Sequence, residues 1–428
     1  MPEATNAHAS PSAGLGSRSE LNDTPPPSFQ GGDRVAQFKT TRRRLLGGAV
    51  AMTALTARAR AAAPALPNSP VALSVIDVAG NLALTQPIFE NYRKAKPQLV
   101  SRMTFTKAPA PEIPGKLKAQ ESAGRVDIDI VLTGTDALAA GIEQGLYVKL
   151  LPDHSAQLPD LQKVYLPAAW KMQSLAQDQG ITITYYPSGP LLEYMPALVK
   201  QVPATADALL AWAKQNPKKF IYARPANSGP GRTFIMGLPY LLGDKDPKDP
   251  KSGWDKTWAY LAELGATVEY YPTGTAAVMK EFGDGTRSMM PTTTGWDINP
   301  RVLGVVPKEA KVAALKGFHW VGDAHYLCVP KGIADEKLAV VLDLIGFMLQ
   351  KDQQAYTYDE GYFYPGPAVA DVPITMAPEQ SQKDIKEFGR PEYAGLIADN
   401  PMELPLDAQA LVYAFRRWDE QIGTKTAK

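Results

Sequence analysis

Strand-like and helix-like segments alternate along the chain from residue 71 onward. Residues 71–77 form an apolar run typical of a buried strand, and a turn separates them from an amphipathic helix. The apolar positions of this helix share one face, at Leu84, Ile88, Phe89 and Tyr92. Further strands are predicted at 99–105 and 128–132, and the helix after the second of them ends at Gly145. The alternation predicts an α/β architecture with parallel strands.

A second α/β set begins after Gly180. Residues 181–186 are rich in β-branched and aromatic side chains, which favour a strand. The elements predicted after it are strands at 220–223, 268–271 and 287–290, a helix from Thr233 and a helix over 273–282. Residues 325–330 form one more apolar run, and helical sequence follows it. Its two apolar stripes are Leu338, Val341, Leu342, Ile345 and Leu349, and then Leu411, Phe415, Trp418 and Ile422.

Two consecutive domains would leave the chain after Asp323 without a sheet of its own. We therefore predict a discontinuous first lobe, residues 64–185 and 325–428, with residues 186–324 inserted as a second lobe. Two crossing strands near Thr184 and His325 would form the hinge. Because ligands of open α/β sheets bind beyond the carboxyl ends of strands, two facing lobes predict a ligand cleft between them.

Residues 1–63 predict a leader and an export signal. Thr41, Arg42 and Arg43 precede a short apolar stretch, 47–57, which is too short to span a bilayer as a helix. This order resembles a twin-arginine signal, which implies the twin-arginine translocase as a partner during export. The alternative is a basic disordered arm before a helical hairpin. Composition predicts disorder for residues 1–40, within which Val35 offers a second start of translation close to the arginines.

Composition narrows the function further. A formal net charge of +1 removes the main electrostatic reason to expect a nucleic-acid partner. The single cysteine, Cys328, cannot form an internal disulfide. The four histidines lie too far apart in sequence for a helical zinc pair. We therefore predict no metal and no cofactor.

Several short segments resemble the bacterial extracellular solute-binding proteins of ABC importers. The similar segments are residues 91–97, 116–120, 127–131, 136–138, 145–146, 192–196 and 329–332. The similarity extends over nearly all of residues 70–370. It is strongest to the group that binds spermidine, thiamine and ferric ion, in its YnjB-like branch. The resemblance implies a two-lobed periplasmic receptor that closes on a small molecule and docks on an inner-membrane permease, without an enzymatic step.

Four segments are predicted to line the cleft, because each follows a strand and enters a helix whose free N–H groups meet an acceptor. The candidate ligand-binding residues are Asp77, Asn81, Thr133, Asp136, Asn227, Ser228, Arg232, Thr294, Trp296 and Asp297. Local structure offers a second interpretation for several of them. Asp136 fits a helix cap, Thr133 fits a strand end, and residues 227–231 fit a turn that glycine and proline dictate.

These residues do not by themselves determine whether the ligand is a cation or an anion. An indole beside a carboxylate, at Trp296 and Asp297, suits an organic cation. Asp77, Asp136, Asp297 and Asp323 favour a cation, whereas Arg224, Arg232 and the helix starts favour a carboxylate or an oxyanion. On balance we predict an organic amine of polyamine or thiamine type.

Two further functions compete with an amine receptor. The tyrosine pairs 185–186 and 270–271 suggest ferric ion, but neighbouring residues of a strand point to opposite faces, so each pair offers one phenol. The other is a cofactor-dependent enzyme exported by the twin-arginine route. The sequence contains no G-x-S-x-G, no G-x-G-x-x-G and no P-loop lysine motif, which argues against this enzyme.

Overall fold

The computed structural model describes residues 63–78 and 80–424. Residues 1–62, nearly all of the predicted leader and export signal, therefore lie outside the described residues. Within the described ranges, no helix is both long enough and apolar enough to cross a membrane.

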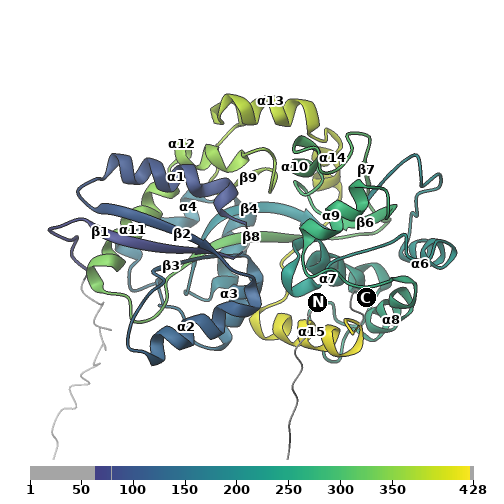
Figure 1. The fold of residues 1–428 in the computed structure, drawn as a ribbon, viewed down its shortest axis with the longest axis horizontal. Helices are drawn as coiled ribbons and strands as arrows, with labels where there is room; N and C mark the ends of the chain where they lie inside the picture. The colour runs from purple at the N-terminus through teal and green to yellow at the C-terminus, as the bar shows by residue number, and fades with distance from the viewer. Residues whose placement is uncertain (1–62, 79, 425–428) are drawn as a thin grey trace, which may run out of the picture. The chain divides into compact units, whose positions relative to one another are not determined.

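A mixed sheet is the centre of the first lobe (Figure 1). Among the described residues its strand order is β2-β1-β3-β8-β4-β9, and β10 pairs with β8. Strand β1 runs parallel to β2 and β3, whereas β8 is antiparallel to β3 and β4. The strands are β1 (Val71–Asp77), β2 (Val100–Lys107), β3 (Ile130–Thr133), β4 (Ile181–Gly189), β8 (Trp320–Cys328), β9 (Gly366–Pro367) and β10 (Met402–Glu403).

Helices cover this sheet with the apolar faces that the sequence predicts. The apolar stripe of α1 is buried throughout, and the stripe of α11 is buried against the same core. Helix α1 begins at Leu82 because the Asp77 carboxylate accepts the backbone N–H groups of Asn81 and Leu82, at 2.9 and 3.3 Å. The helices are α1 (Leu82–Ala95), α2 (Ile113–Ser122), α3 (Thr135–Glu143), α4 (Leu161–Val164), α5 (Pro167–Gln173), α11 (Asp335–Met348) and α12 (Lys351–Gln354).

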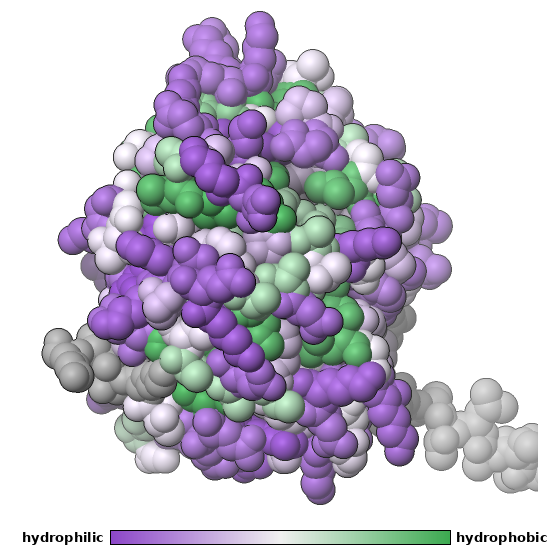
Figure 2. Space-filling view, turned by 90° about the vertical axis from the view of Figure 1, so that its right-hand side faces the viewer, coloured by the Kyte–Doolittle hydropathy of each residue, from purple (hydrophilic) through white to green (hydrophobic). Residues whose placement is uncertain are grey.

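The second lobe is built around a small antiparallel sheet with the order β6-β5-β7. Its strands are β5 (Leu191–Tyr194), β6 (Met289–Thr292) and β7 (Lys311–Ala313). The helices near it are α6 (Ala206–Gln215), α7 (Gly229–Leu242), α8 (Asp255–Thr267), α9 (Thr275–Gly283) and α10 (Asn299–Val302). Figure 2 shows the face at this end of the molecule, where hydrophilic side chains divide the apolar ones into small patches.

Two strands predicted in the second lobe do not form. Residues 220–223 make one isolated bridge, between Phe220 and Met289, and residues 268–271 belong to no strand. Residues 220–223 are buried, whereas in 268–271 only Val268 and Tyr271 are. Backbone hydrogen bonds join the two stretches just beyond their ends, from the N–H of Lys218 to the carbonyl of Thr267 and from the N–H of Arg224 to the carbonyl of Pro272. Pro272 has no N–H to donate, so it cannot continue a ladder at that end.

Two long strands connect the lobes. Strands β4 and β8 are buried over their whole length and run side by side through the middle of the structure (Figure 1). Strand β4 continues almost directly into β5 of the second sheet. Thr184 and His325, the predicted hinge positions, are register partners in the β4–β8 ladder.

The C-terminal helices differ from the predicted division of the chain, which assigns residues 325–428 to the first lobe. Trp418 of α15 packs against Tyr222 and Tyr271, with ring centroids 6.0 and 4.8 Å apart, in the core cluster of the second lobe. Helix α15 also passes beside α3 (Figure 1). The apolar stripe predicts burial but does not specify which core accepts it. The helices are α13 (Glu379–Phe388), α14 (Glu392–Asp399) and α15 (Ala408–Gln421).

Candidate functional site

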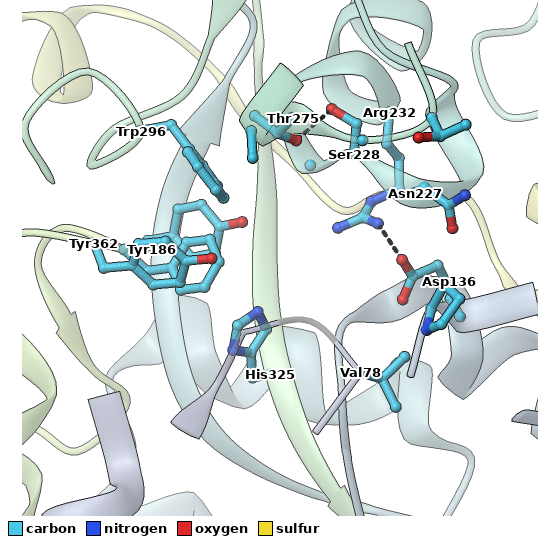
Figure 3. Close-up of a pocket in the computed structure, with 17 residues that line it drawn as sticks. Val78, Asp136, Tyr186, Asn227, Ser228, Arg232, Thr275, Trp296, His325 and Tyr362 are labelled. Atoms are coloured by element: carbon cyan, nitrogen blue, oxygen red, sulfur yellow. Dashed lines mark hydrogen bonds and ion pairs between the residues drawn. The ribbon is translucent and has the colours of Figure 1, made fainter. Parts of the chain in front are cut away.

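A cavity of about 530 Å³ lies between the lobes, beside the connecting strands (Figure 3). Its lining includes Asp136 from the first lobe, Tyr186 and His325 from β4 and β8, and Arg232 from the second lobe. Small-molecule sites typically enclose roughly 300–1,000 Å³, so the cavity has a suitable size. Its position is the cleft that the sequence predicts.

Aromatic rings form one side of the cavity. Trp296, Tyr186 and Tyr362 lie together on that side in Figure 3. The Phe363 ring also lines the cavity and contacts the rings of all three. The ring centroids of Trp296 and Tyr362 are 4.8 Å apart, and those of Tyr186 and Phe363 are 4.6 Å apart. Rings held against one another in this way offer rigid faces for stacking or for a cation.

A buried group of charges lies opposite the rings. Arg232, at the start of α7, donates from Nη1 to Asp136 Oδ2 at 3.1 Å and from Nη2 to Asp323 Oδ2. The Tyr186 hydroxyl also donates to Asp323 Oδ2, at 2.8 Å. The Arg232–Asp136 bond joins α7 of the second lobe to α3 of the first and is visible in Figure 3. The polar side of the cavity is therefore held by an ion pair between the lobes.

Burial changes the acidity of these groups. It raises the pKa of the Asp136 carboxyl, while the Arg232 guanidinium acts in the opposite direction. Burial alone would lower the pKa of Arg232, but the charges of Asp323 and Asp136 outweigh it and raise that pKa. Burial and the Asp323 charge raise the pKa of the Tyr186 phenol. Arg232 therefore stays a cation, and Tyr186 stays a neutral hydrogen-bond donor.

The turn into α7 forms the polar upper end of the cavity. Ser228 Oγ caps the helix by accepting the Gly231 N–H at 3.1 Å, and Thr275 Oγ1 donates to Ser228 Oγ at 2.8 Å. A Cβ at Gly231 would lie 2.5 Å from the Ala223 carbonyl oxygen, which explains the glycine. Within the described residues, the buried side-chain carbonyl of Asn227 has no hydrogen-bond partner, so it is available to a ligand.

Asn81 fixes the imidazole at the base of the cavity. Thr85 Oγ1 donates to Asn81 Oδ1 at 2.6 Å, so the Asn81 amide nitrogen faces His325 Nδ1 at 2.9 Å. Nδ1 is then the acceptor, which places the single proton of the neutral ring on Nε2. Burial lowers the pKa of His325 to about 4. The imidazole is therefore uncharged near neutral pH.

Five of the ten predicted residues line the cavity. These are Asp136, Asn227, Ser228, Arg232 and Trp296. Their placement agrees with the prediction, and contact with a ligand remains a prediction.

The other five predicted residues are buried behind the cavity wall. Asp77 binds the N-terminus of α1, and Asn81 binds His325. Thr133 Oγ1 donates to the carbonyl of Gly134, and Thr294 Oγ1 accepts the Ser188 N–H at 3.3 Å.

Asp297 is the clearest departure from the expected site. Its carboxylate is buried and accepts hydrogen bonds from Arg390 Nε at 2.7 Å and from the Tyr393 hydroxyl at 2.6 Å. Arg301 Nη2 lies 3.4 Å away. Trp296 faces the cavity whereas Asp297, the next residue, points into the second lobe. The two residues therefore do not act as one ligand-binding pair.

Sequence reasoning missed the aromatic loop after α12. Tyr362 and Phe363 line the cavity, although they follow no strand and precede no helix. The available signal was an aromatic cluster between Gly361 and Pro365. Thr275 was missed as a lining residue as well, because it appeared only as part of a helix.

A metal site is not evident in the described part of the chain. No group of three or more His, Cys, Asp or Glu side chains is placed there to hold a metal ion. Tyr185 and Tyr186 point to opposite faces of β4, as strand alternation predicts, with the Tyr185 hydroxyl directed at Met402 Sδ. That pair therefore presents only one phenol to the cavity.

Several solved structures share this architecture at low sequence identity. The periplasmic thiamin binding protein has a TM-score of 0.58 and 14% identity, covering 85% of this chain and 100% of that one. The spermidine/putrescine transporter substrate-binding protein from Streptococcus pneumoniae has a TM-score of 0.54 and 13% identity, covering 81% and 99%. An ABC transporter substrate-binding protein from Bradyrhizobium japonicum has a TM-score of 0.56 and 19% identity, covering 82% and 99%. These similarities establish the two-lobed periplasmic binding protein fold that the sequence predicts.

The sequence itself identifies the family. No curated protein matches it significantly. The family model described as bacterial extracellular solute-binding protein matches residues 88–387, which is more than half of the chain. Together with the two lobes, the connecting strands and the cavity between them, this match shows that the chain belongs to the bacterial extracellular solute-binding proteins.

Proposed function

We propose that the protein is the periplasmic receptor of an ABC importer and that it captures an organic amine for delivery to the permease. The observation that carries the proposal is a single cavity in which a carboxylate, Asp136, faces a side made of Trp296, Tyr186 and Tyr362. A carboxylate neutralises an ammonium group, and aromatic faces attract a cation through their quadrupole. An amine with a compact apolar body would use both sides.

The charges around the cavity support a cation over an anion. Arg232 and the N-terminus of α7 would attract a carboxylate or an oxyanion. Both terminal nitrogens of Arg232 are already held by Asp136 and Asp323, however. His325 adds no positive charge at neutral pH, because burial lowers its pKa to about 4. Among the described residues, Arg232 Nε has no hydrogen-bond partner, so one buried donor of the guanidinium remains for an anion. The preference for a cation therefore rests on the two carboxylates that share this single positive charge.

The hinge supports capture by closure. Asp136 belongs to the first lobe, Trp296 belongs to the second, and β4 and β8 connect the two. A solute held between these side chains contacts both lobes at once, so its binding energy favours the closed arrangement. Such a receptor presents a different surface to the permease when it is loaded.

Export through the twin-arginine translocase completes the proposal. It rests on Arg42 and Arg43 before the apolar stretch, in the part of the chain that lies outside the described residues. Replacing both arginines by lysine should leave the precursor in the cytoplasm, whereas the wild-type protein should reach the periplasm as a shortened form. Equal processing of both proteins in cells that lack the translocase would refute this route.

Thermal unfolding with small-angle scattering tests the receptor itself. A ligand that binds only the folded protein stabilises it by about 2.7 kcal/mol at one hundred times its dissociation constant. Amines should raise the melting temperature and reduce the radius of gyration of the mature protein, whereas sugars and oxyanions should do neither. An oxyanion that produces both effects would overturn the amine class but not the receptor. If no solute in the panel compacts the protein, the receptor proposal fails.

A further inference from the structure

Asp323 lies behind the cavity wall and its charge is fully used within the protein. Its side chain is 1% exposed, and it is not among the residues that line the cavity. Oδ2 accepts from Arg232 and from the Tyr186 hydroxyl. Oδ1 accepts from the Ala324 N–H at 3.0 Å and from Thr135 Oγ1 at 3.4 Å. Asp323 and Arg232 therefore form an internal neutral pair.

Asp136 keeps capacity for a ligand. Its Oδ1 accepts the Ala137 N–H at 2.8 Å, and its Oδ2 accepts one bond from Arg232 at 3.1 Å. A carboxylate has about four lone-pair sites, so the two bonds leave room for another donor. Unlike Asp323, Asp136 lines the cavity.

With Asp136 ionised, a state that the Arg232 charge favours and burial opposes, the buried group as a whole carries one excess negative charge. Two carboxylates, Asp136 and Asp323, share the single guanidinium of Arg232. Asp136 and Arg232 are the charged side chains among the cavity-lining residues that the structure describes, since His325 is neutral at its lowered pKa of about 4. Asp77, which lies behind Val78, is bound to the N-terminus of α1. One positive charge on the solute is enough to neutralise this cavity.

We infer that Arg232 is the specificity-determining residue of this site: by occupying Asp323 and part of Asp136, it restricts the solute to organic cations with a single positive charge and rejects diamines and polyamines. The inference rests on the proposed receptor function and narrows its substrate class. The second ammonium of a diamine would lose its water among Trp296, Tyr362 and Phe363. Contact with a ring face would offset only part of that cost without a second carboxylate. Removing the guanidinium releases the second carboxylate.

A matched pair of probes and three variants test this inference. The probes are 4-methylbenzylamine and 1,4-bis(aminomethyl)benzene, which share one ring and differ in one ammonium group. The variants are Asp136→Asn, Arg232→Gln and the double variant Arg232→Gln with Asp136→Asn. With Asp323 counted in each variant, their excess charges are zero, two negative and one negative. Calorimetric titration of the mature proteins gives the dissociation constants.

The wild-type protein should bind the monoamine at least tenfold more tightly than the diamine. Asp136→Asn should weaken monoamine binding at least tenfold, and the double variant should regain most of it because one negative charge is restored. Arg232→Gln should reverse the preference in favour of the diamine. That variant leaves two buried carboxylates unpaired, so if it fails to fold, the comparison of Asp136→Asn with the double variant still decides.

Three results would overturn the inference. They are equal or tighter binding of the diamine by the wild type, unchanged monoamine binding by Asp136→Asn, and failure of the wild type to bind either amine. If another solute then binds and compacts the protein, the receptor proposal stands while the role of Arg232 in charge selection is refuted. If no solute compacts the protein, both proposals fail together.

Discussion

Two buried ion clusters in this protein are built from the same types of side chain, arginine and aspartate, but differ in their relation to the cavity. At the cavity, one arginine, Arg232, serves two carboxylates, and the cluster keeps a negative charge that faces the ligand space. Inside the second lobe, Asp297 is held by Arg301 and Arg390, and the buried Glu193 carboxyl lies within electrostatic reach of all three. Asp297 accepts the Tyr393 hydroxyl as well, and it has no contact with the cavity. The first cluster faces the ligand space, whereas the second lies away from the cavity, inside the second lobe.

The comparison shows what separates a binding carboxylate from a structural one. Both Asp136 and Asp297 follow a strand, and both stand in segments that the sequence predicts to line the cleft. What differs is the number of internal donors that reach each carboxylate, and those donors come from distant parts of the chain. Arg390 and Tyr393 lie more than ninety residues after Asp297.

Substituting asparagine for Asp297 and for Asp136 should give the largest difference in stability between the two clusters. Asp297→Asn removes the carboxylate that is bonded to Arg301 and Arg390, leaves only the buried Glu193 carboxyl near them, and should destabilise the protein by about 3–5 kcal/mol. Asp136→Asn leaves Arg232 paired with Asp323, so its effect on unfolding should be much smaller. Urea unfolding of both variants measures the difference. Equal losses of stability would show that the two clusters do not differ in this way.

Low pH should reduce the stability of the folded protein through His325, which lines the cavity. The pKa of His325 is lowered from 6.5 to about 4, so the unfolded chain binds a proton in this range while the folded protein does not. Stability is therefore lost as the pH falls from about 6.5 towards 4, by up to about 3 kcal/mol from this residue. His325→Gln cannot titrate and serves as the reference, because other groups shift with pH in both proteins.

Unfolding free energies of the two proteins at pH 7 and pH 4.5 measure this contribution. The wild type should lose about 2–3 kcal/mol more than His325→Gln over the interval. A difference between the two proteins that stays constant with pH would contradict the burial of a neutral imidazole at the hinge.

The aromatic side should give the smallest of the three effects. Trp296→Ala removes one ring face from the cavity and should weaken amine binding by roughly 0.5–2 kcal/mol. Trp170→Ala is the matched control, because Trp170 on α5 is 39% exposed and lies outside the cavity lining. Calorimetric titration with 4-methylbenzylamine measures both variants. Equal weakening by the two substitutions would remove Trp296 from the binding surface.

Local patterns predict much of the framework. Strand β1 has the predicted bounds, the apolar face of α1 is the buried one, and Thr184 and His325 pair at the hinge. These features depend on strand alternation, helical periodicity and the order of the strands, all of which can be recognised from short stretches of sequence. The same rules placed half of the predicted site residues in the cavity.

Long-range contacts explain the failures. The burial of Asp297 depends on Arg390 and Tyr393, and the placement of Tyr362 depends on a loop that meets Gly295. There a Cβ on Gly295 would lie 2.5 Å from the Tyr362 carbonyl oxygen. Neither contact leaves a periodic signal. The core that accepts α15 was unpredictable for the same reason, since amphipathicity gives a face but no partner.

Filling the cavity tests the central claim most directly. Gly229 lines the cavity, where a Cβ would lie 3.5 Å from the Tyr186 hydroxyl, so the longer side chain of Gly229→Leu should occupy the ligand space. The decisive measurement is the dissociation constant of 4-methylbenzylamine, by calorimetric titration, for the wild type and for a folded Gly229→Leu variant. We predict one site per chain in the wild type and at least a tenfold loss of affinity in the variant. Unchanged affinity in the folded variant would show that the amine binds elsewhere and would contradict the account.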